Sequence, residues 1–376
     1  MKGDRVTDLK KRTDEMKKTV FAVTDPHGCA SALKAALREA GFDRSNPTHL
    51  LVVCGDYFDR GKENRAVFVY LDGIKNKVLI RGNHEDSLER IMRTGKLSAT
   101  DRYNGTDITV REFFRGDYIP EYDYLYTDPT SETYRELNGF LREGLDYFET
   151  ENYIFTHGWL PVEWDYDGIP TLIPDWRHAT ALQWYNGRWT GWNKVYPHRA
   201  GKIGEKGKTV VCGHRSARYG SHFDTERAED SVEPFFGEGV VALDAFTVST
   251  GRVNVLRIEN EEVPDPVTHE MSLRDMPFNA VRSGVKRIEM RLFDEKRQRL
   301  RLRDRIAFRH AETGELYGAN ITGLYRYADF FELARVFPPE ELGFPDGSAY
   351  DIACYMKGIY GEADIKRYGA LAIQID

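Results

Sequence analysis

Five short apolar segments, each followed at once by a polar cluster, restrict the folds open to this chain more than any other feature. The first, TVFAVT at residues 19–24, precedes DPHG and then a stretch with helical periodicity, CASALKAALREAGF at residues 29–42. Apolar strands that alternate with helices and end in polar residues are typical of a layered α/β fold, in which function gathers at the carboxyl ends of the strands. Adjacent strands lie about 5 Å apart, so side chains at their ends can meet in one site. The other four segments are LLVVC before GDYFDRG, NKVLI before RGNHED, NYIFT before HGW, and KTVVC before GHR.

The bulk composition narrows the class of protein. A chain of 376 residues with 41% hydrophobic residues exceeds one ordinary domain and can bury a large core, so we expect two domains. The net charge of -7 argues against a protein coated in nucleic acid. The start of the chain lacks the apolar centre of a signal peptide, and no run approaches the about 18 apolar residues of a membrane span, so we expect a cytoplasmic protein with no membrane partner. The four cysteines form no CxxC pair, which favours a reducing compartment; they are Cys29, Cys54, Cys212 and Cys354.

Changes in composition along the chain predict three segments. Residues 1–18 form a charged N-terminal segment, residues 19–262 a first domain, and residues 271–376 a second. The stretch VPDPVTHEMS at residues 263–272 combines two prolines with polar residues and separates the two patterned regions. Within the second domain, which reads as a small mixed α/β unit, residues 282–309 hold 11 basic and 4 acidic residues.

Six side chains in the polar clusters have the chemistry of a site for two metal ions. Carboxylate and amide oxygens together with imidazoles suit borderline divalent ions such as manganese, iron or zinc. His27 follows Asp25 by two residues, so a turn can direct both at one ion, and Asp56 at the next strand end can be shared by two ions. Two cations lower the pKa of a bridging water and so supply a hydroxide for in-line attack on a phosphate ester. The predicted metal ligands are Asp25, His27, Asp56, Asn83, His157 and His214.

Four further residues in the same clusters have predicted catalytic roles. Arg60 and Arg81 flank the ligands, and a guanidinium can bind two phosphoryl oxygens while it stays charged at any working pH. His84 lies next to Asn83 and is placed to protonate the leaving oxygen. Asp59 is the carboxylate expected to fix the tautomer of that histidine and to raise its pKa.

Each of these residues, taken alone, also has an ordinary explanation. A single Asp after a strand is more often a turn residue or a helix cap, and a single His is usually structural or solvated. The ordered set of DPHG, GDYFDRG, RGNHED, THG and GHR, every member at a strand end, favours the functional interpretation. All six tryptophans lie from Trp159 to Trp192, in an insert that we expect to form a cap. Aromatic residues are more often core than substrate contacts, and both uses stay open for this cap.

With these motifs, residues 19–258 resemble the calcineurin-like metallophosphoesterases, and within them the branch of the phosphoprotein phosphatases. The resemblance implies a layered α/β fold, a β-sandwich flanked by helices. It also implies that the positions of Asp25, His27 and Asp56 bind one metal ion. The other ion is then bound by Asp56 together with a second set of ligands, which are Asn83, His157 and His214. Arg60 and Arg81 match phosphate contacts of the family, and Asp59 and His84 match its acid dyad.

The details of the motifs resemble compact bacterial and phage protein phosphatases and symmetrical diadenosine tetraphosphatases. The interval between GDYFDRG and RGNHED is short, and NGT stands at residues 104–106 where relatives often carry NGG. Thr24 stands where the family usually has Gly, Arg215 follows the last ligand where Thr is common, and LDAFTVSTG replaces the usual DTG. None of these departures removes a ligand, but they alter the rim of the site.

The second domain carries a different resemblance. GVKRIEMR resembles the signature of ASCH domains, which implies a small barrel of the PUA-like class with RNA or a nucleotide as its partner. The resemblance makes Lys286, Glu289 and Arg291 the candidate ligand cleft. On charge alone, a solvated pair of basic strands with its loop is the favoured explanation of this region, and only with the resemblance are the two explanations equal.

Three functions are compatible with this sequence. The leading one is hydrolysis of phosphomonoesters with two divalent metal ions, with Ser/Thr phosphoproteins as the substrate that the resemblance suggests. The second is cleavage of a dinucleoside polyphosphate or an RNA end, directed by the ASCH-like domain. The third is a regulator that binds RNA or a nucleotide and has a vestigial phosphatase domain, against which the intact ligand set argues.

Overall fold

The computed structural model describes residues 17–198 and 204–376, so most of the predicted charged segment 1–18 lies outside the described residues. The chain divides into two compact units. The first consists of the residues up to Leu172 together with Tyr185–Pro264. The second consists of Ile173–Trp184 and Asp265–Asp376. A short segment of the predicted cap therefore folds with the carboxyl-terminal part of the chain.

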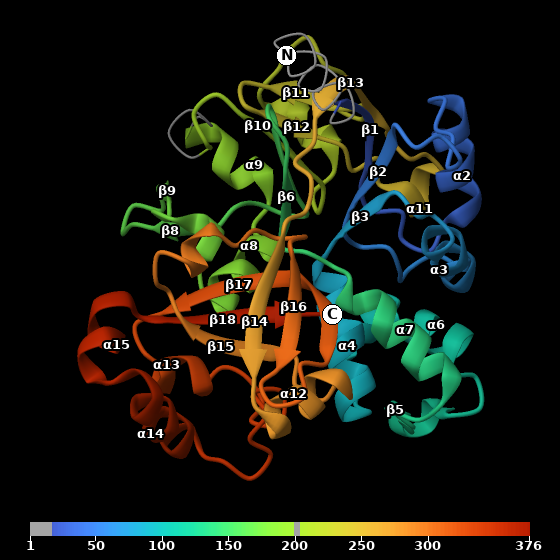
Figure 1. Ribbon diagram of the computed structural model, residues 1–376. Coiled ribbons are helices and arrows are strands. Elements are labelled where there is room, and N and C mark those ends of the chain that lie inside the picture. Colours follow the sequence, from blue (N-terminus) through green and yellow to red (C-terminus); the bar gives the residue numbers. More distant parts are fainter. Residues whose placement is uncertain (1–16, 199–203) are drawn as a thin grey trace, which may run out of the picture. The chain divides into compact units, whose positions relative to one another are not determined.

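One half of the first unit is a four-stranded sheet in the order β13-β1-β2-β3. β1, β2 and β3 are parallel to one another, and β13 pairs antiparallel with β1. The helices α2 and α3 lie beside this sheet (Figure 1). α2 buries Ala30, Leu33 and Leu37, because residues spaced by three and four positions share one face of a helix. The bounds are β1 Lys17–Val23, β2 His49–Cys54, β3 Lys77–Ile80, β13 Leu256–Glu262, α2 Ala30–Glu39 and α3 Asn64–Asp72.

The other half of the first unit is a five-stranded sheet in the order β11-β12-β10-β7-β6. β10 lies parallel to β7 and β12, and the outer pairs are antiparallel. The bounds are β6 Tyr147–Glu149, β7 Tyr153–Thr156, β10 Thr209–Cys212, β11 Phe235–Gly237 and β12 Val240–Ala242. All five predicted apolar strands are thus confirmed, as β1, β2, β3, β7 and β10.

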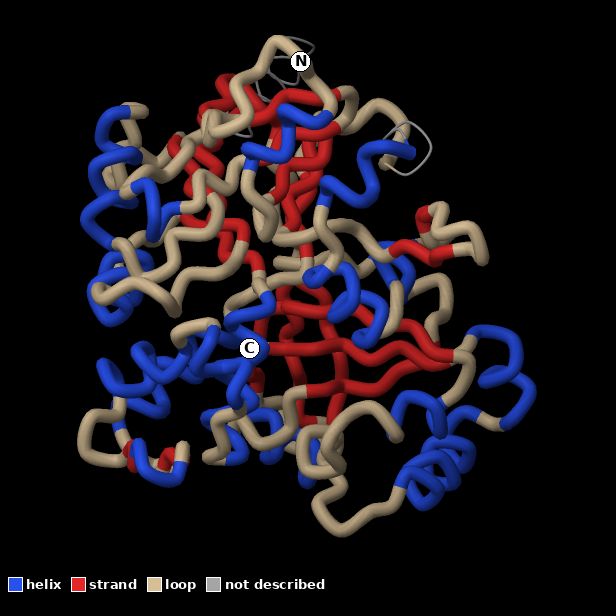
Figure 2. Tube along the Cα trace, turned by 180° about the vertical axis from the view of Figure 1, so that it is seen from behind, coloured by secondary structure: helices blue, strands red, loops and turns tan. Residues whose placement is uncertain are grey.

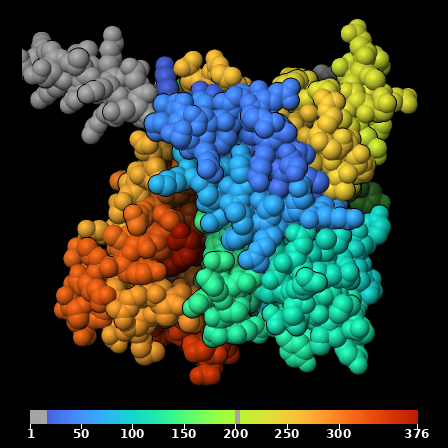
Figure 3. Space-filling model, turned by 90° about the vertical axis from the view of Figure 1, so that its right-hand side faces the viewer, coloured from blue at the N-terminus to red at the C-terminus, as the bar shows by residue number. Residues whose placement is uncertain are grey.

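Three of the four helices between β3 and β6, namely α4, α6 and α7, pack into the same core as α2 and α3. α4 begins at Asn83, directly after the loop that follows β3. Val110, Phe113, Leu137 and Phe140 of this region join the core formed by β1 and β2. In Figure 3 the segment between β3 and β6, in cyan to teal, lies against the blue residues of the first strands and helices. The remaining helices and strands of this unit are α4 Asn83–Thr94, α5 Ala99–Tyr103, α6 Thr106–Phe113, β4 Tyr118–Ile119, β5 Tyr124–Leu125, α7 Glu132–Arg142, β8 Val162–Trp164, β9 Pro170–Leu172, α9 Trp192–Val195 and α11 Thr247–Thr250.

The second unit is built on a five-stranded sheet in the order β14-β16-β17-β18-β15. The long strand β17 pairs with both β16 and β18, and its register shifts between Ile321 and Gly323. Figure 2 shows the strands in red as a strongly curved sheet. A curved sheet with helices at its edges confirms the predicted PUA-like mixed α/β barrel. The bounds are β14 Thr268–Leu273, β15 Ile288–Leu292, β16 Arg305–His310, β17 Leu316–Tyr327 and β18 Ala370–Ile375.

The helices of the second unit carry clear start signals. Ser348 and Asp351 form a reciprocal capping box at the start of α14, and Asp329 caps α13. Within the described residues, no helix combines the length and apolar character that crossing a bilayer requires. The bounds are α12 Asp275–Arg282, α13 Phe330–Ala334, α14 Ala349–Tyr360 and α15 Glu362–Tyr368; α8 Ala181–Trp189 contributes residues to both units.

Candidate active site

The loops that follow β1, β2 and β10 carry an unusual concentration of left-handed backbone. Residues other than glycine rarely adopt positive φ, and such strain gathers where side chains must be aimed at a site. Six predicted site residues have it: Asp25 (φ 49), His27 (φ 41), Asp56 (φ 51), Asp59 (φ 75), Arg60 (φ 65) and His214 (φ 61). The strand ends therefore turn sharply and direct these side chains toward one region.

Two glycines allow these loops to approach one another. A Cβ on Gly213 would collide with the carboxylate of Asp25. A Cβ on Gly55, whose φ is +79°, would lie 2.5 Å from Nδ1 of His157. Glycine at these positions lets the ends of the two sheets meet.

Asp56 lies at the centre of the cluster. Its Oδ2 is 3.6 Å from Nε2 of His27 and 3.7 Å from Nε2 of His84, and its Oδ1 is 3.3 Å from Nε2 of His157. The two oxygens of one carboxylate thus face two different sets of imidazoles. The nitrogens and oxygens of His27, Asp56 and His84, and those of Asp56, His157 and His214, lie within 4.8 Å of one another in each set. This is the arrangement expected of a carboxylate that two ions share.

The tautomers of two histidines are set by backbone carbonyls. Nδ1 of His27 lies 3.0 Å from the carbonyl of Phe58, and Nδ1 of His157 lies 2.9 Å from that of Cys54. A carbonyl only accepts, so both Nδ1 atoms carry the hydrogen and both Nε2 lone pairs face Asp56. Burial lowers the pKa of both imidazoles, and it keeps them neutral, as metal ligands must be.

Two further observations show that the cluster fits a cation. Nε2 of His214 is buried, and no described residue forms a hydrogen bond with it. Burial and then the neighbouring His157 lower the pKa of His214 to about 3, so the ring is neutral and can offer a lone pair to a cation. Burial and then the charges of Asp244 and Asp56 raise the pKa of Asp25 well above its ordinary value. Carboxylates that lie close together near an imidazole nitrogen with no hydrogen-bond partner are suitable ligands for a divalent ion.

The comparison with protein families agrees with this geometry. Residues 18–243, more than half of the chain, match the family described as calcineurin-like phosphoesterase. The chain is a calcineurin-like phosphoesterase. Residues 271–376 match the ASCH domain. Both predicted resemblances are confirmed, and the protein is a metal-dependent phosphoesterase.

Several solved structures are similar to parts of this phosphoesterase. A Pyrococcus furiosus protein is 29% identical and covers 29% of this chain and 96% of its own, with a TM-score of 0.24. A cold-active protein-tyrosine phosphatase of Shewanella is 17% identical and covers 65% and 76%, with a TM-score of 0.36. A Saccharomyces cerevisiae protein serine/threonine phosphatase is 12% identical and covers 67% and 82%, with a TM-score of 0.34. A search of the curated proteins finds no match.

His84 and Asp59 of the phosphoesterase form a buried pair. Nδ1 of His84 lies 2.6 Å from Oδ2 of Asp59, and the hydroxyls of Thr106 and Thr109 donate to the same carboxylate at 2.6 and 2.5 Å. Burial lowers the pKa of His84, but the charge of Asp56 and the hydrogen bond to Asp59 outweigh it and raise that pKa to about 9. The imidazole therefore holds a proton at neutral pH, as the predicted acid requires.

The structure places the two predicted phosphate-binding arginines differently. Arg60 is exposed, and its Nη1 and Nη2 lie 2.9 Å from Nε2 of His27 and 3.3 Å from Nε2 of His84. Arg81 pairs with two carboxylates of α4: its Nε donates to Asp86 at 2.5 Å and its Nη2 donates to Glu89. The guanidinium of Arg81 is therefore already neutralised by two carboxylates. Its role as a phosphate contact stays a prediction, and that of Arg60 has geometric support.

Sequence reasoning missed several residues that support the site. Glu85 accepts hydrogen bonds from the backbone of Asp56, Tyr57 and Gly82 and so joins two of the loops. It stands inside RGNHED, so that motif contained its signal. Thr106 is the last residue of the NGT that differs from the NGG of relatives, and it holds Asp59.

The candidate cleft of the ASCH domain is a buried network of charges. Nζ of Lys286 lies 3.2 Å from Oε2 of Glu289 and 3.1 Å from the carbonyl of Leu342. Arg291 pairs with the other oxygen of Glu289, whose side chain is 1% exposed. Burial raises the pKa of Glu289, but Arg291 and Lys286 outweigh it and lower that pKa. The three residues do come together, and their role in binding a ligand stays a prediction.

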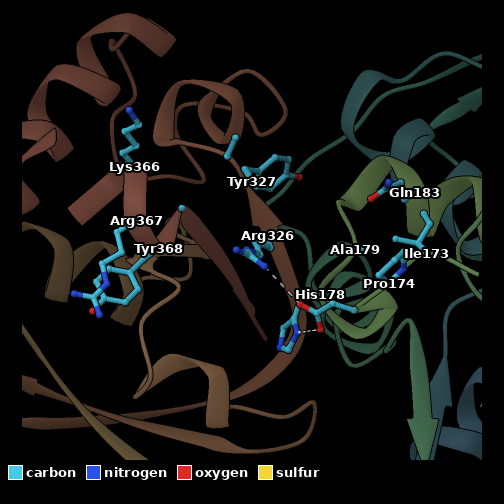
Figure 4. A pocket seen from close by; sticks show the side chains of 13 residues that line it. Ile173, Pro174, His178, Ala179, Gln183, Arg326, Tyr327, Lys366, Arg367 and Tyr368 are labelled. Carbon is cyan, nitrogen blue, oxygen red and sulfur yellow. Dashed lines mark hydrogen bonds and ion pairs between the residues drawn. The ribbon is translucent and has the colours of Figure 1, made fainter. Parts of the chain in front are cut away.

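A cavity of about 410 Å³ lies elsewhere in the same unit (Figure 4). Arg326 at the end of β17 reaches toward Asp175, with Nη1 3.9 Å from Oδ2, and its guanidinium lies 4.6 Å from the ring centre of Phe293. Lys366 and Arg367, from the end of α15, also line the cavity. None of the three residues of the predicted cleft lines it.

Proposed function

We propose that this phosphoesterase hydrolyses phosphomonoesters with two divalent metal ions, of manganese, iron or zinc. The observation that supports it best is Asp56, whose two oxygens face separate sets of imidazoles. Asp25 and His27 would hold one ion, and Asp56 would be shared between the two ions. The second ion would also be held by Asn83, His157 and His214. When bound, the ions would supply a nucleophile at neutral pH and would neutralise the phosphoryl oxygens.

The protein's own side chains supply the remaining steps. Arg60, exposed beside two of the imidazoles, binds and orients the phosphoryl group through a charged pair of N–H donors. His84 donates its proton to the departing oxygen. Asp59 holds the imidazole in place and stabilises its charged form, because a buried carboxylate favours a cation beside it.

Removal and return of metal tests this proposal. Dialysis against a chelator should abolish hydrolysis, and added manganese should restore it, because the described site residues place no Ser, Cys or Thr in the position of a nucleophile. Full turnover in excess chelator, after metal analysis has shown that the ions are gone, contradicts the mechanism. A panel of phosphopeptides, diadenosine tetraphosphate and RNA ends then separates the predicted Ser/Thr phosphoprotein substrates from the nucleotide alternatives.

The ASCH unit is proposed to bind a nucleotide or RNA in the cavity beside Arg326. A cavity of about 410 Å³ has the size of a small-molecule site, and three cationic side chains line it. Arginine and lysine contacts to phosphate give an affinity that falls steeply with salt.

Titration of a labelled nucleotide and a labelled short RNA at two salt concentrations tests that cavity. Replacing Arg326 and Lys366 together by Ala should weaken binding and lower its salt dependence. Arg335→Ala, an exposed arginine that does not line the cavity, is the matched control. Equal affinity of the double variant and the control contradicts the assignment.

A further inference from the structure

Two of the six tryptophans stay exposed, and one of them lies at the active site. Trp159, Trp176, Trp184 and Trp192 are at most 2% exposed, which confirms the core role for most of the aromatic insert. Trp189 is 40% exposed. Its ring centre lies 6.1 Å from that of His214, and the two rings are nearly perpendicular at 81°. The ring of Trp189 is therefore a large apolar surface that is exposed to solvent beside a predicted metal ligand.

A second exposed ring lies beside Trp189 and enlarges this surface. Tyr185, one helical turn before Trp189 on α8, is 42% exposed, and its ring centre lies 6.4 Å from that of Trp189. Residues four positions apart lie on the same face of a helix, so the two rings form one strip. Exposed aromatic strips that do not pack in the core commonly mark binding surfaces.

The strip is held rigidly relative to the catalytic loops. Arg188, next to Trp189, donates to Asp86 at 2.8 Å and to Asp146 at 2.5 Å. The carbonyl of Gly187 accepts from the backbone N–H of Trp159, two residues after His157, at 2.9 Å. These contacts fix the last turn of α8 against the loop of one ligand and against α4, so Trp189 is preorganised.

We propose that Trp189, with Tyr185 behind it, stacks on an aromatic ring in the leaving group of the substrate, and that the substrates are nucleoside phosphates. The inference rests on the proposed function, because it takes the phosphoryl group to lie at the cluster around Asp56. Planar bases stack on aromatic side chains without regard to sequence, and each stack contributes about 5- to 150-fold in binding.

The distances favour a nucleoside over a phenyl ester. In an aryl phosphate the ring is attached directly to the ester oxygen, so it stays beside the phosphorus. In a nucleoside 5′-phosphate the ribose separates the base from the phosphorus. The ring of Trp189 lies 6.1 Å from that of His214, and the ring of Tyr185 lies 6.4 Å from that of Trp189, spacings that suit a ring carried on a spacer of the size of a sugar.

The ordinary alternative is that Trp189 only supports the imidazole of His214. An edge contact between the two rings would then orient a metal ligand and nothing more. Loss of support lowers turnover of every substrate by the same factor, whereas loss of stacking lowers turnover only of substrates that carry the ring. A pair of substrates that differ only in the base separates the two roles.

Adenosine 5′-monophosphate and ribose 5-phosphate form such a pair, because both release the same primary alcohol oxygen. We expect the wild-type protein, loaded with manganese, to show a kcat/KM at least about fivefold higher for the nucleotide. Trp189→Ala should bring that ratio close to one, and Trp189→Phe should keep most of it. Trp164→Ala is the matched control, since Trp164 on β8 is 45% exposed and makes no ring contact with a described site residue.

A binding measurement makes the test independent of turnover. Adenosine, which has no phosphate, should bind the metal-free protein in equilibrium dialysis and should bind Trp189→Ala at least about fivefold more weakly. Hydrolysis of neither phosphate with any metal counts against the proposed function, while the adenosine measurement still decides the stacking. Equal kcat/KM for both substrates in the wild type, equal losses on both in Trp189→Ala, or a Trp189-dependent preference confined to phosphotyrosine peptides overturns the inference.

Discussion

Replacing Asp59 by Asn removes one negative charge from the acid dyad and leaves its shape intact. Oδ2 of Asp59 accepts from His84 and Thr106, and Oδ1 accepts from Thr109. An Asn oxygen in the Oδ2 position keeps two of these bonds, and its NH2 group can donate to the Thr109 hydroxyl, which can turn to accept. The variant should therefore fold and retain its metal, so that it isolates the effect of the charge.

The expected magnitude follows from the buried bond between His84 and Asp59. A hydrogen bond to an ionised partner contributes about 1–2 kcal/mol more than a neutral one. That difference lowers the pKa of His84 from about 9 by about one unit, so the imidazole stays protonated at neutral pH and turnover should fall only through looser orientation, by less than about 30-fold. His84→Asn should lose about 100-fold or more, the usual range for a missing acid.

The assay compares an alkyl phosphate such as phosphoserine with p-nitrophenyl phosphate. A good leaving group needs its proton less, so both variants should lose less turnover on the nitrophenyl ester. Asp128→Asn is the matched control, because Asp128 also accepts from a threonine hydroxyl but does so on an exposed loop. Equal losses on both substrates with chemistry rate-limiting, or loss of metal from either dyad variant, would refute the assignment of His84 as the acid.

Three further predictions concern the ligands and the buried ion pairs. Asp56→Asn should lose both ions in metal analysis, whereas Asp25→Asn should lose one, and retention of two ions with near-normal turnover in the Asp56 variant contradicts the shared role. Arg188→Leu removes a buried guanidinium that pairs with Asp86 and Asp146 and should lower the free energy of unfolding in urea by about 3 kcal/mol, against less than about 1 kcal/mol for the exposed Arg252→Leu; equal small losses contradict it. The pKa of His214 is lowered to about 3 by burial and His157, so between pH 6.5 and pH 3 the unfolded chain binds a proton that the folded chain does not. The metal-free protein should lose stability as the pH falls through that range, and His214→Asn should lose less, with a slope smaller by up to about 1.4 kcal/mol per pH unit; identical slopes contradict the low pKa.

The strands and the ligand cluster could be predicted because their signals are local. Each apolar run is nearly continuous, as expected of buried parallel strands, and each ends in a short cluster that must turn sharply. The left-handed backbone at Asp25 and Asp56 was not predicted, since it depends on how the two sheets meet.

The structural features that could not be predicted from the sequence depend on contacts between residues far apart in the chain. Arg188 reaches Asp86, 102 residues earlier in the chain, and no pattern around either residue indicates the pair. The segment Ile173–Trp184 folds with the ASCH unit, where His178 lies 4.7 Å from the ring of Phe293. The boundary predicted in residues 263–272 stays a prediction, and no composition change near residues 173–184 indicates that this segment folds with the second unit.

The central claim is that Asp56 is shared by two metal ions, and anomalous diffraction from crystals grown with manganese tests it most directly. We expect two peaks about 3.5–4 Å apart with Asp56 between them, one beside Asp25 and His27 and the other beside His157 and His214. His84 should lie outside both coordination shells. A single peak, or a peak bound by His84 in place of Asp25, would contradict the account.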